Sequence, residues 1–222
     1  MSEMVCTYFV DVGAPSAPVR EALAVWARSR IRAGYLPHVL TEQEASRHPR
    51  YEELKALIAS LPTVNLPKYE EACFLRWLAL EVVGHPLMVD FDVLNFGLTP
   101  ELLRADIEAG GAAGQFVILD RSGIPCAVYA GTDTERHQLV DTVFDEKALD
   151  AGLVEIDGRP HLSDMTVLQE QKWIPRIPLC DLWPNGLPLR HFQTDVSGGN
   201  YVSKVDLMTS MDADYEASLK QP

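Results

Sequence analysis

The sequence has no apolar run close to the roughly 20 residues that a membrane-spanning helix needs. Its first ten residues, MSEMVCTYFV, also lack the basic segment, apolar stretch and small-residue cleavage site of an export signal. The overall composition, 47% hydrophobic and 23% charged, is typical of a globular domain. We therefore expect a soluble, cytoplasmic protein without a membrane span.

Cysteine is scarce, with four in 222 residues, and none has the C-x-x-C spacing of a zinc site or a redox motif. Each lies among apolar residues, an environment typical of reduced thiols in a core. The sequence therefore argues against a disulfide framework and predicts structural free thiols at Cys6, Cys73, Cys126 and Cys180.

Positive charge is also in short supply. The 19 Lys and Arg residues stand against 32 Asp and Glu residues, which gives a formal net charge of -13. A field of that sign repels a phosphate backbone unless basic residues gather locally. The densest basic cluster is Arg28, Arg30 and Arg32, and no aromatic residue is interleaved with it. Nucleic acid is therefore a disfavoured partner, although a concentrated patch could overcome the mean field.

Several catalytic motifs are missing as well. The chain has no G-x-S-x-G sequence and no evident cysteine-histidine nucleophile pair, which argues against hydrolases of those kinds. A glycine-rich stretch at 110–114 lacks the spacing and the preceding strand of a phosphate-binding loop. We interpret that stretch as a connector.

The N-terminal third has the pattern of a strand, a helix and a second strand. Residues 5–12 are rich in β-formers, Val19, Leu23 and Trp26 share one helical face, and residues 35–40 read as a strand after a helix-ending Gly34. This spacing predicts a βαβ unit with parallel pairing. We expect a single α/β domain over 1–205, with a mixed, mostly parallel sheet flanked by helices, and a polar, poorly ordered tail over 206–222.

The rest of the chain continues the alternation of helices and strands. The last of the predicted helices is short, and a turn at 121–124 joins two of the strands. The sequence predicts helices near 50–60, 69–83, 99–108 and 165–171, and strands at 87–89, 116–120 and 125–131.

Two carboxylates, Asp90 and Asp92, directly follow the apolar strand at 87–89. In an extended segment, side chains two residues apart point the same way, so both acids should face the space where open α/β sheets bind ligands. Two carboxylates there would raise each other's pKa unless a cation shared the site. Hard ions such as Mg²⁺ and Mn²⁺ suit such oxygen ligands and complete their coordination with phosphate oxygens. The plainer interpretation is a solvated strand end or a helix-capping pair.

The stretch around these acids, NLPKYEEACFLRWLALEVVGHPLMVDFDVLNFG, resembles the nucleotide-sugar glycosyltransferases of the GT-A fold that carry a D-x-D motif. Arg76 matches the arginine of the family's helix, Leu80 its leucine and Gly84 its turn glycine, and the two aspartates match the D-x-D.

The stretch departs from the family's pattern in two ways. Cys73 stands where the family's helix has an aspartate, and the segment between Arg76 and Asp90 is about one residue longer, with His85-Pro86 in place of the usual second glycine and its neighbour.

Two weaker matches lie downstream. LSDMTVLQEQ resembles the family's second acidic element at the start of a helix and puts Asp164 there, while LPLRHFQTD resembles a late strand that ends in a metal-binding histidine, here His191. The resemblance follows most of the chain in order but is specific only at 65–97. As plainer alternatives, Asp164 would be an N-cap, His191 a structural histidine, and Arg76 a surface or helix-pairing arginine.

The resemblance implies a metal-dependent glycosyltransferase that moves a sugar from a nucleotide-sugar donor, with a UDP-sugar favoured, to a hydroxyl. It implies Mn²⁺ or Mg²⁺ on Asp92 and His191, with Asp90 sharing the ion or reaching the ribose. Arg76 would face the donor sugar or its phosphates, and Asp164 would contact the sugar or act as a base. The implied donor-binding residues are Val10, Asp11, Val12, Gly13, Arg76, Asp90, Phe91 and Asp92.

Two other functions stay open at this stage. Cys73 in place of the family's acid is compatible with a degenerate, non-catalytic domain that binds nucleotide sugars. A metal-dependent phosphoryl-transfer or hydrolytic enzyme could also use D-x-D, although the sequence reveals no further acidic cluster. The acceptor, whether a glycan, a metabolite, a protein or a modified DNA base, is not readable from the residues.

Overall fold

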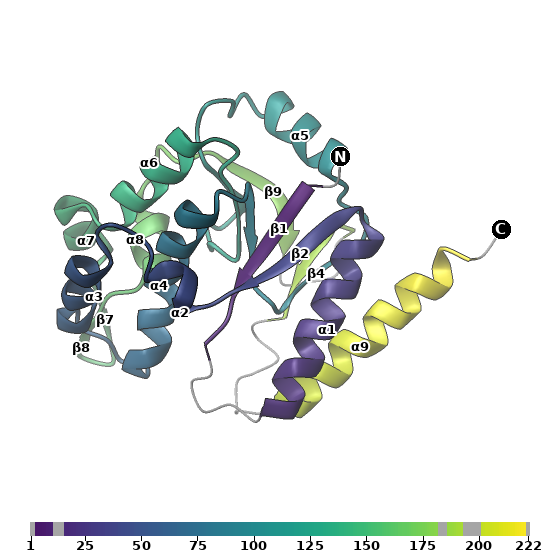
Figure 1. Ribbon diagram of the computed structural model, residues 1–222, viewed down its shortest axis with the longest axis horizontal. Helices are drawn as coiled ribbons and strands as arrows, with labels where there is room; N and C mark the ends of the chain where they lie inside the picture. Colours follow the sequence, from purple (N-terminus) through teal and green to yellow (C-terminus); the bar gives the residue numbers. More distant parts are fainter. Residues whose placement is uncertain (1–2, 11–15, 182–185, 193–200, 221–222) are drawn as a thin grey trace.

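The computed structural model describes residues 3–10, 16–181, 186–192 and 201–220. Within these residues, eight strands form one sheet in the order β2-β1-β3-β6-β5-β9-β10-β4 (Figure 1). The strands are β1 (Glu3–Tyr8), β2 (Tyr35–Leu40), β3 (Leu87–Val89), β4 (Val93–Asn95), β5 (Val117–Asp120), β6 (Ala127–Tyr129), β9 (Arg176–Asp181) and β10 (Leu189–His191).

Six of these strands run in the same direction. β1 is parallel to β2 and β3, β5 is parallel to β9, and β9 is parallel to β10. β6 is antiparallel to both of its neighbours, β3 and β5, which are therefore parallel to each other, and β4 is antiparallel to β10. The prediction of an α/β protein with a mixed, mostly parallel sheet is confirmed.

Helices cover both faces of the sheet, and a two-stranded hairpin lies apart from it. The helices are α1 (Ser16–Arg32), α2 (Glu42–Ala45), α3 (Tyr51–Ser60), α4 (Pro67–Val83), α5 (Pro100–Ala109), α6 (Asp133–Val143), α7 (Glu146–Gly152), α8 (Asp164–Glu170) and α9 (Tyr201–Ser218). The hairpin consists of β7 (Val154–Ile156) and β8 (Arg159–His161).

The central strands are buried on both sides, as expected for a sheet between two helical layers. On β3, Met88 packs into the cluster formed with α3, α4, α6, α7 and α8, whereas Leu87 and Val89 pack toward α1 and α5. Figure 1 shows the first group of helices gathered on one side of the sheet, with α1 and α9 beside each other on the other. The alternation follows from the two-residue period of a strand.

Helix α4 is central to the site described below, and its limits follow from local chemistry. Pro67 occupies the first turn, where its missing N–H costs nothing, and Gly84 ends the helix in the left-handed conformation with φ 70°. Between them Phe74, Trp77 and Leu78 are fully buried. The helix predicted at 69–83 is therefore present and starts one half-turn earlier.

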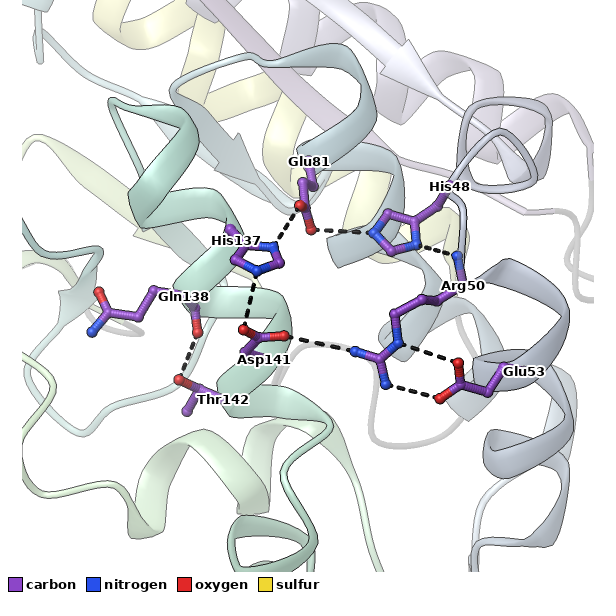
Figure 2. A network of polar contacts seen from close by, with 8 residues as sticks. All are labelled: His48, Arg50, Glu53, Glu81, His137, Gln138, Asp141 and Thr142. Atoms are coloured by element: carbon purple, nitrogen blue, oxygen red, sulfur yellow. Dashed lines mark hydrogen bonds and ion pairs between the residues drawn. The ribbon is translucent and has the colours of Figure 1, made fainter.

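The C-terminal end of α4 is held by a polar network (Figure 2). The Glu81 carboxylate meets His137 Nδ1 on α6 at 3.0 Å and His48 Nε2, just before α3, at 3.3 Å. His137 Nε2 lies 3.2 Å from Asp141, which lies 3.7 Å from Arg50. The hydrogen bond to Glu81 and the charge of Asp141 raise the pKa of His137. Glu81 thus ties α4 to two neighbouring elements through imidazoles.

The chain from 206 onward differs from the predicted poorly ordered tail. Most of it belongs to α9, whose Val205 and Met208 are buried against Ala22 and Val25 of α1. The buried Asp212 carboxylate also lies 2.6 Å from Arg32 Nη2. The apolar positions of this segment are too few to signal a helix alone, and α1 supplies the surface that buries them.

The predicted basic cluster is divided between interior and surface. Arg30 is fully buried and donates from Nη2 to the Val93 carbonyl at 2.7 Å, and Arg32 pairs with Asp212. Only Arg28 of the three has a side chain that is more than half exposed. These arginines are therefore not a continuous basic patch.

Cys6, Cys126 and Cys180 are buried free thiols, as predicted, whereas Cys73 is only partly buried. None of the helices in the described part of the chain combines the length and apolarity needed to cross a bilayer.

Candidate functional site

Asp90, Asp92 and His191 meet at the carboxyl ends of the parallel strands. One ligand atom from each lies within 4.8 Å of the others. β3 ends at Val89, the chain turns, and it returns as β4, which pairs with β10 so that Val93 stands opposite His191. This pairing brings a residue about 100 positions downstream beside the two acids.

The two acids reach this common space by a route other than the predicted one. Residues 90–92 form a turn, closed by the Val93 amide that donates to the Asp90 carbonyl at 3.0 Å, and are not extended. The argument from alternating side chains is therefore wrong in its premise. The turn itself, followed by reversal into β4, directs both carboxylates to the same space.

Asp92 is ion-paired inside the protein. Lys204 Nζ on α9 lies 2.5 Å from its Oδ2, and His191 Nε2 lies 3.5 Å from its Oδ1. Burial opposes ionisation of Asp92, but these two partners outweigh it and hold the pKa of Asp92 well below its usual range. Burial likewise opposes protonation of His191, yet the Asp92 carboxylate raises its pKa. Both side chains are thus held in their charged forms.

Asp90 has a different partner. It accepts a hydrogen bond from Arg76 Nη1 at 2.5 Å, and about a third of its side chain is exposed. Burial of the carboxylate in the cavity wall raises the pKa of Asp90 to about 6; the Arg76 charge opposes the rise and the Asp92 carboxylate adds to it. The two acids of the D-x-D motif therefore differ in basicity, because Lys204 and His191 together outweigh burial at Asp92, whereas Arg76 does not outweigh it at Asp90.

Arg76 also binds Asp164, at the start of α8. Its Nε and Nη2 donate to Asp164 Oδ2 at 3.0 Å and 2.6 Å, and Trp77 Nε1 donates to the same oxygen at 2.9 Å. The guanidinium lies over the Trp77 ring, 4.3 Å from its centroid. Burial lowers the pKa of Arg76, but Asp164 and Asp90 reverse this and raise it. Arg76 is therefore a buried residue that binds two carboxylates, and not the surface or helix-pairing arginine of the plainer interpretation.

Asp164 is not the N-cap of α8, because Ser163 takes that place and accepts from the Thr166 amide. Asp164 supplies a carboxylate to Arg76 from α8, whereas the resemblance expects a helix acid at Cys73. Cys73 itself faces the cavity, and burial raises its pKa, so the thiol stays protonated.

These side chains surround a cavity of about 150 Å³. Six parts of the chain contribute to its wall: α4 with the residues just before it, the D-x-D turn, the segment before β6, the end of β8, the start of α8 and the end of β10. The lining residues are Asn65, Tyr69, Glu70, Cys73, Arg76, Asp90, Asp92, Ile124, Pro125, Cys126, His161, Ser163, Asp164, Met165 and His191.

Glu70 is the lining acid that sequence reasoning missed. It is only 5% exposed; its Oε1 accepts from Asn65 Nδ2 at 2.5 Å, and its Oε2 has no partner within the described residues. Burial raises the pKa of Glu70 to about 7, with Asn65 opposing and Asp164 adding to the rise. The missed signal is its spacing of three residues from Cys73 and six from Arg76, which puts all three on one face of a helix.

The predicted nucleotide-binding strand end is only partly described. Val10 lies in the described region but does not line the cavity, and Asp11, Val12 and Gly13 lie outside the described residues. Phe91, in the D-x-D turn, packs edge-on against Phe9 with ring centroids 5.9 Å apart. The turn therefore contacts the segment that follows β1.

The donor set fits a divalent ion. Two carboxylates and one imidazole suit Mn²⁺, and also Mg²⁺ when phosphate and water complete the shell, but His191 must first give up the proton that Asp92 favours, because only a neutral imidazole binds a metal. The ammonium of Lys204 already neutralises Asp92, so an ion bound there must share or displace it. No model of a known protein family, no curated protein and no solved structure matches this chain.

Proposed function

We propose that this chain is a metal-dependent glycosyltransferase of GT-A architecture that moves a sugar from a nucleotide-sugar donor, preferably a UDP-sugar, to a hydroxyl. The single observation that carries the proposal is the meeting of Asp90, Asp92 and His191 within 4.8 Å beside a cavity that also contains Arg76. In open α/β sheets, ligands bind outside the carboxyl ends of the strands, and these residues lie there.

The size of the cavity supports a mode of binding in which it holds only the sugar part of the donor. At about 150 Å³ it is smaller than the ~300–1,000 Å³ that encloses a whole ligand. It suits a sugar ring, and the nucleotide would extend toward the end of β1, where Phe9 and Phe91 pack together. This assignment agrees with the donor-binding role implied for the residues after β1.

In the proposed reaction, Asp92, His191 and Asp90 would hold Mn²⁺ or Mg²⁺. The ion would stabilise the negative charge that develops on the departing diphosphate. Arg76 presents its guanidinium to the donor sugar or to the bridging phosphate oxygen, and it is oriented by Asp164 and Trp77. Asp164 is accordingly a positioning residue for Arg76. These groups are fixed before the donor arrives, which lowers the cost of reorganisation.

The proposal is tested by ligand-dependent stability. We expect Mn²⁺ and UDP together to raise the melting temperature of the wild type, and Asp92→Asn to remove that rise. Asp212→Asn is the matched control, because Asp212 is also a buried aspartate paired with a cation but lies far along α9 from Lys204. It should lower stability and keep the ligand response. A wild type that responds to no nucleoside diphosphate would overturn the proposal.

A non-catalytic nucleotide-sugar-binding domain is the second candidate. The Lys204–Asp92 ion pair favours it, because a protein cation already neutralises the acid that a metal would need. A panel of nucleotide sugars with Mn²⁺, followed by nucleoside diphosphate release, separates the two functions. Release of diphosphate identifies a transferase, and binding without release identifies the binding domain. Phosphate esters in the same panel test the phosphoryl-transfer alternative.

A further inference from the structure

The cavity contains four carboxylates, and three of them are paired with a cation. Asp92 binds Lys204, and Asp90 and Asp164 share the guanidinium of Arg76. Glu70 alone among these four has no cationic partner within the described residues, and its Oε2 is buried without a hydrogen-bond partner. A buried polar oxygen without a partner costs free energy, so its place in a cavity wall points to a ligand that donates to it.

Glu70 is held in position by its own segment. Asn65, immediately before α4, donates to Oε1, which fixes the carboxyl group and leaves Oε2 free. Cys73 and Arg76 follow Glu70 on the same face of α4, three and six residues further along. The Arg76 side chain reaches Asp90 in the D-x-D turn. The free carboxylate oxygen and the predicted sugar-contacting guanidinium therefore belong to the same wall of one cavity.

We propose that Glu70 is the general base of the transfer and binds the acceptor hydroxyl through Oε2. The inference depends on the proposed glycosyltransferase function. In the step, the acceptor oxygen forms a bond to the anomeric carbon, and the bond from that carbon to the diphosphate oxygen breaks. The acceptor proton passes to Glu70, and the diphosphate leaves with the electron pair of the broken bond.

The groups that face Glu70 favour this role. Arg76, Cys73 and Tyr69 come from its own helix, Asp164 comes from α8, and His161 comes from β8. Burial lowers the pKa of His161, so this imidazole is neutral near pH 7 and does not compensate a carboxylate. With a pKa near 7, Glu70 is a stronger base than an ordinary carboxylate and is still ionised in part at neutral pH.

The test uses water as the acceptor probe, because slow donor hydrolysis needs no identified acceptor. Wild-type hydrolysis of a UDP-sugar with Mn²⁺ should rise with pH through about 7. Glu70→Gln keeps the shape and the Asn65 contact but cannot accept a proton. It should lower the hydrolysis rate about 10²- to 10⁴-fold and abolish that rise. The affinity for UDP with Mn²⁺ should stay within about twofold, because Glu70 is not a ligand of the proposed metal.

Two further variants separate a chemical role from a structural one. Glu71→Gln is the matched control, because Glu71 follows in the same turn and lies 3.7 Å from Lys55, outside the cavity lining. It should behave as the wild type. Asn65→Ala removes the hydrogen bond that lowers the pKa of Glu70, so the midpoint of the pH profile should move upward. A merely structural Asn65 would change the rate without moving the midpoint.

The results that overturn the inference differ from those that overturn the proposed function. If Glu70→Gln hydrolyses the donor at the wild-type rate with the same pH profile, Glu70 is not the base, and the transferase assignment survives. If the wild type neither binds UDP with Mn²⁺ nor cleaves any donor, the proposed function fails and the inference fails with it.

Discussion

Arg76 on α4 and Asp164 on α8 form a buried ion pair in which Nη2 lies 2.6 Å from Oδ2. The same guanidinium reaches Asp90, so one side chain joins a helix, the D-x-D turn and the start of another helix. Both members of the pair are less than a tenth exposed. A buried ion pair adds little to the stability of the fold compared with an apolar pair of similar size. Removal of one partner, however, leaves the other as an uncompensated buried charge, which is strongly destabilising.

Arg76→Met should therefore destabilise the fold strongly. We expect a loss of about 3 kcal/mol in the free energy of unfolding, because Asp164 and Asp90 would be left without their cation. Urea denaturation measures the loss. The double variant Arg76→Met, Asp164→Leu should recover part of it, since no uncompensated charge then remains at α8. Equal stability of the single and double variants would contradict this account of the pair.

Lys204→Met should increase the affinity of the site for Mn²⁺. The ammonium of Lys204 lies 2.5 Å from Asp92 and competes with a divalent ion for the same carboxylate. Without Mn²⁺ the variant should melt at a lower temperature than the wild type, because Asp92 loses its strongest neutralising contact. With Mn²⁺ the difference should shrink. Calorimetric titration with Mn²⁺ gives the affinity, and Lys220→Met, which removes an exposed lysine near Glu216, serves as control.

Glu70→Gln should stabilise the protein at alkaline pH. The folded pKa of Glu70, about 7, lies above its ordinary value, so the folded state binds more protons than the unfolded state between pH ~4.5 and ~7. Stability falls with rising pH across that window, and Gln removes the fall. The gain above pH ~7 is at most about 3 kcal/mol and vanishes below pH ~4.5. Unfolding measured at pH 4.5 and pH 8 tests the sign.

His137→Gln should change the stability of the protein at acidic pH, whereas Glu70→Gln changes it at alkaline pH. The pKa of His137 is raised in the folded state by Glu81 and Asp141, so protonated His137 stabilises the fold below its unfolded pKa. That contribution disappears as the pH rises through the folded pKa. The substitution should therefore cost a few tenths of a kcal/mol at most near pH 5.5, since the side chain is exposed, and nothing near pH 9. Melting temperatures at the two pH values provide the measurement.

Much of the fold followed from local patterns. The helices predicted near 99–108 and 69–83 are α5, capped by Thr99, and α4, ended by Gly84, and the apolar run at 87–89 forms a strand as predicted. Each of these features depends on the conformational preferences of neighbouring residues. The burial of central strands on both faces follows in the same way from uninterrupted apolar runs.

The site was predicted only in outline. Asp90 and Asp92 were selected from their position after an apolar strand, Arg76, Asp164 and His191 were selected from a resemblance, and the tertiary structure brings all five to one cavity. Glu70 was missed, because a glutamate in the first turns of a helix is ordinarily a solvated residue that favours the helix dipole. The role proposed for Glu70 depends on its burial, which no local pattern reports.

The amino-acid sequence alone determined the alternation of strands and helices, the ends of those elements and the presence of paired acids after an apolar strand, because these depend on residues close together in the chain. The tertiary structure alone decided that residues 90–92 turn, that α9 packs on α1, and that Lys204 neutralises Asp92, which lies 112 positions earlier in the sequence. Contacts of this kind depend on which surfaces meet after folding, and burial at those surfaces then sets the charge and basicity of each acid.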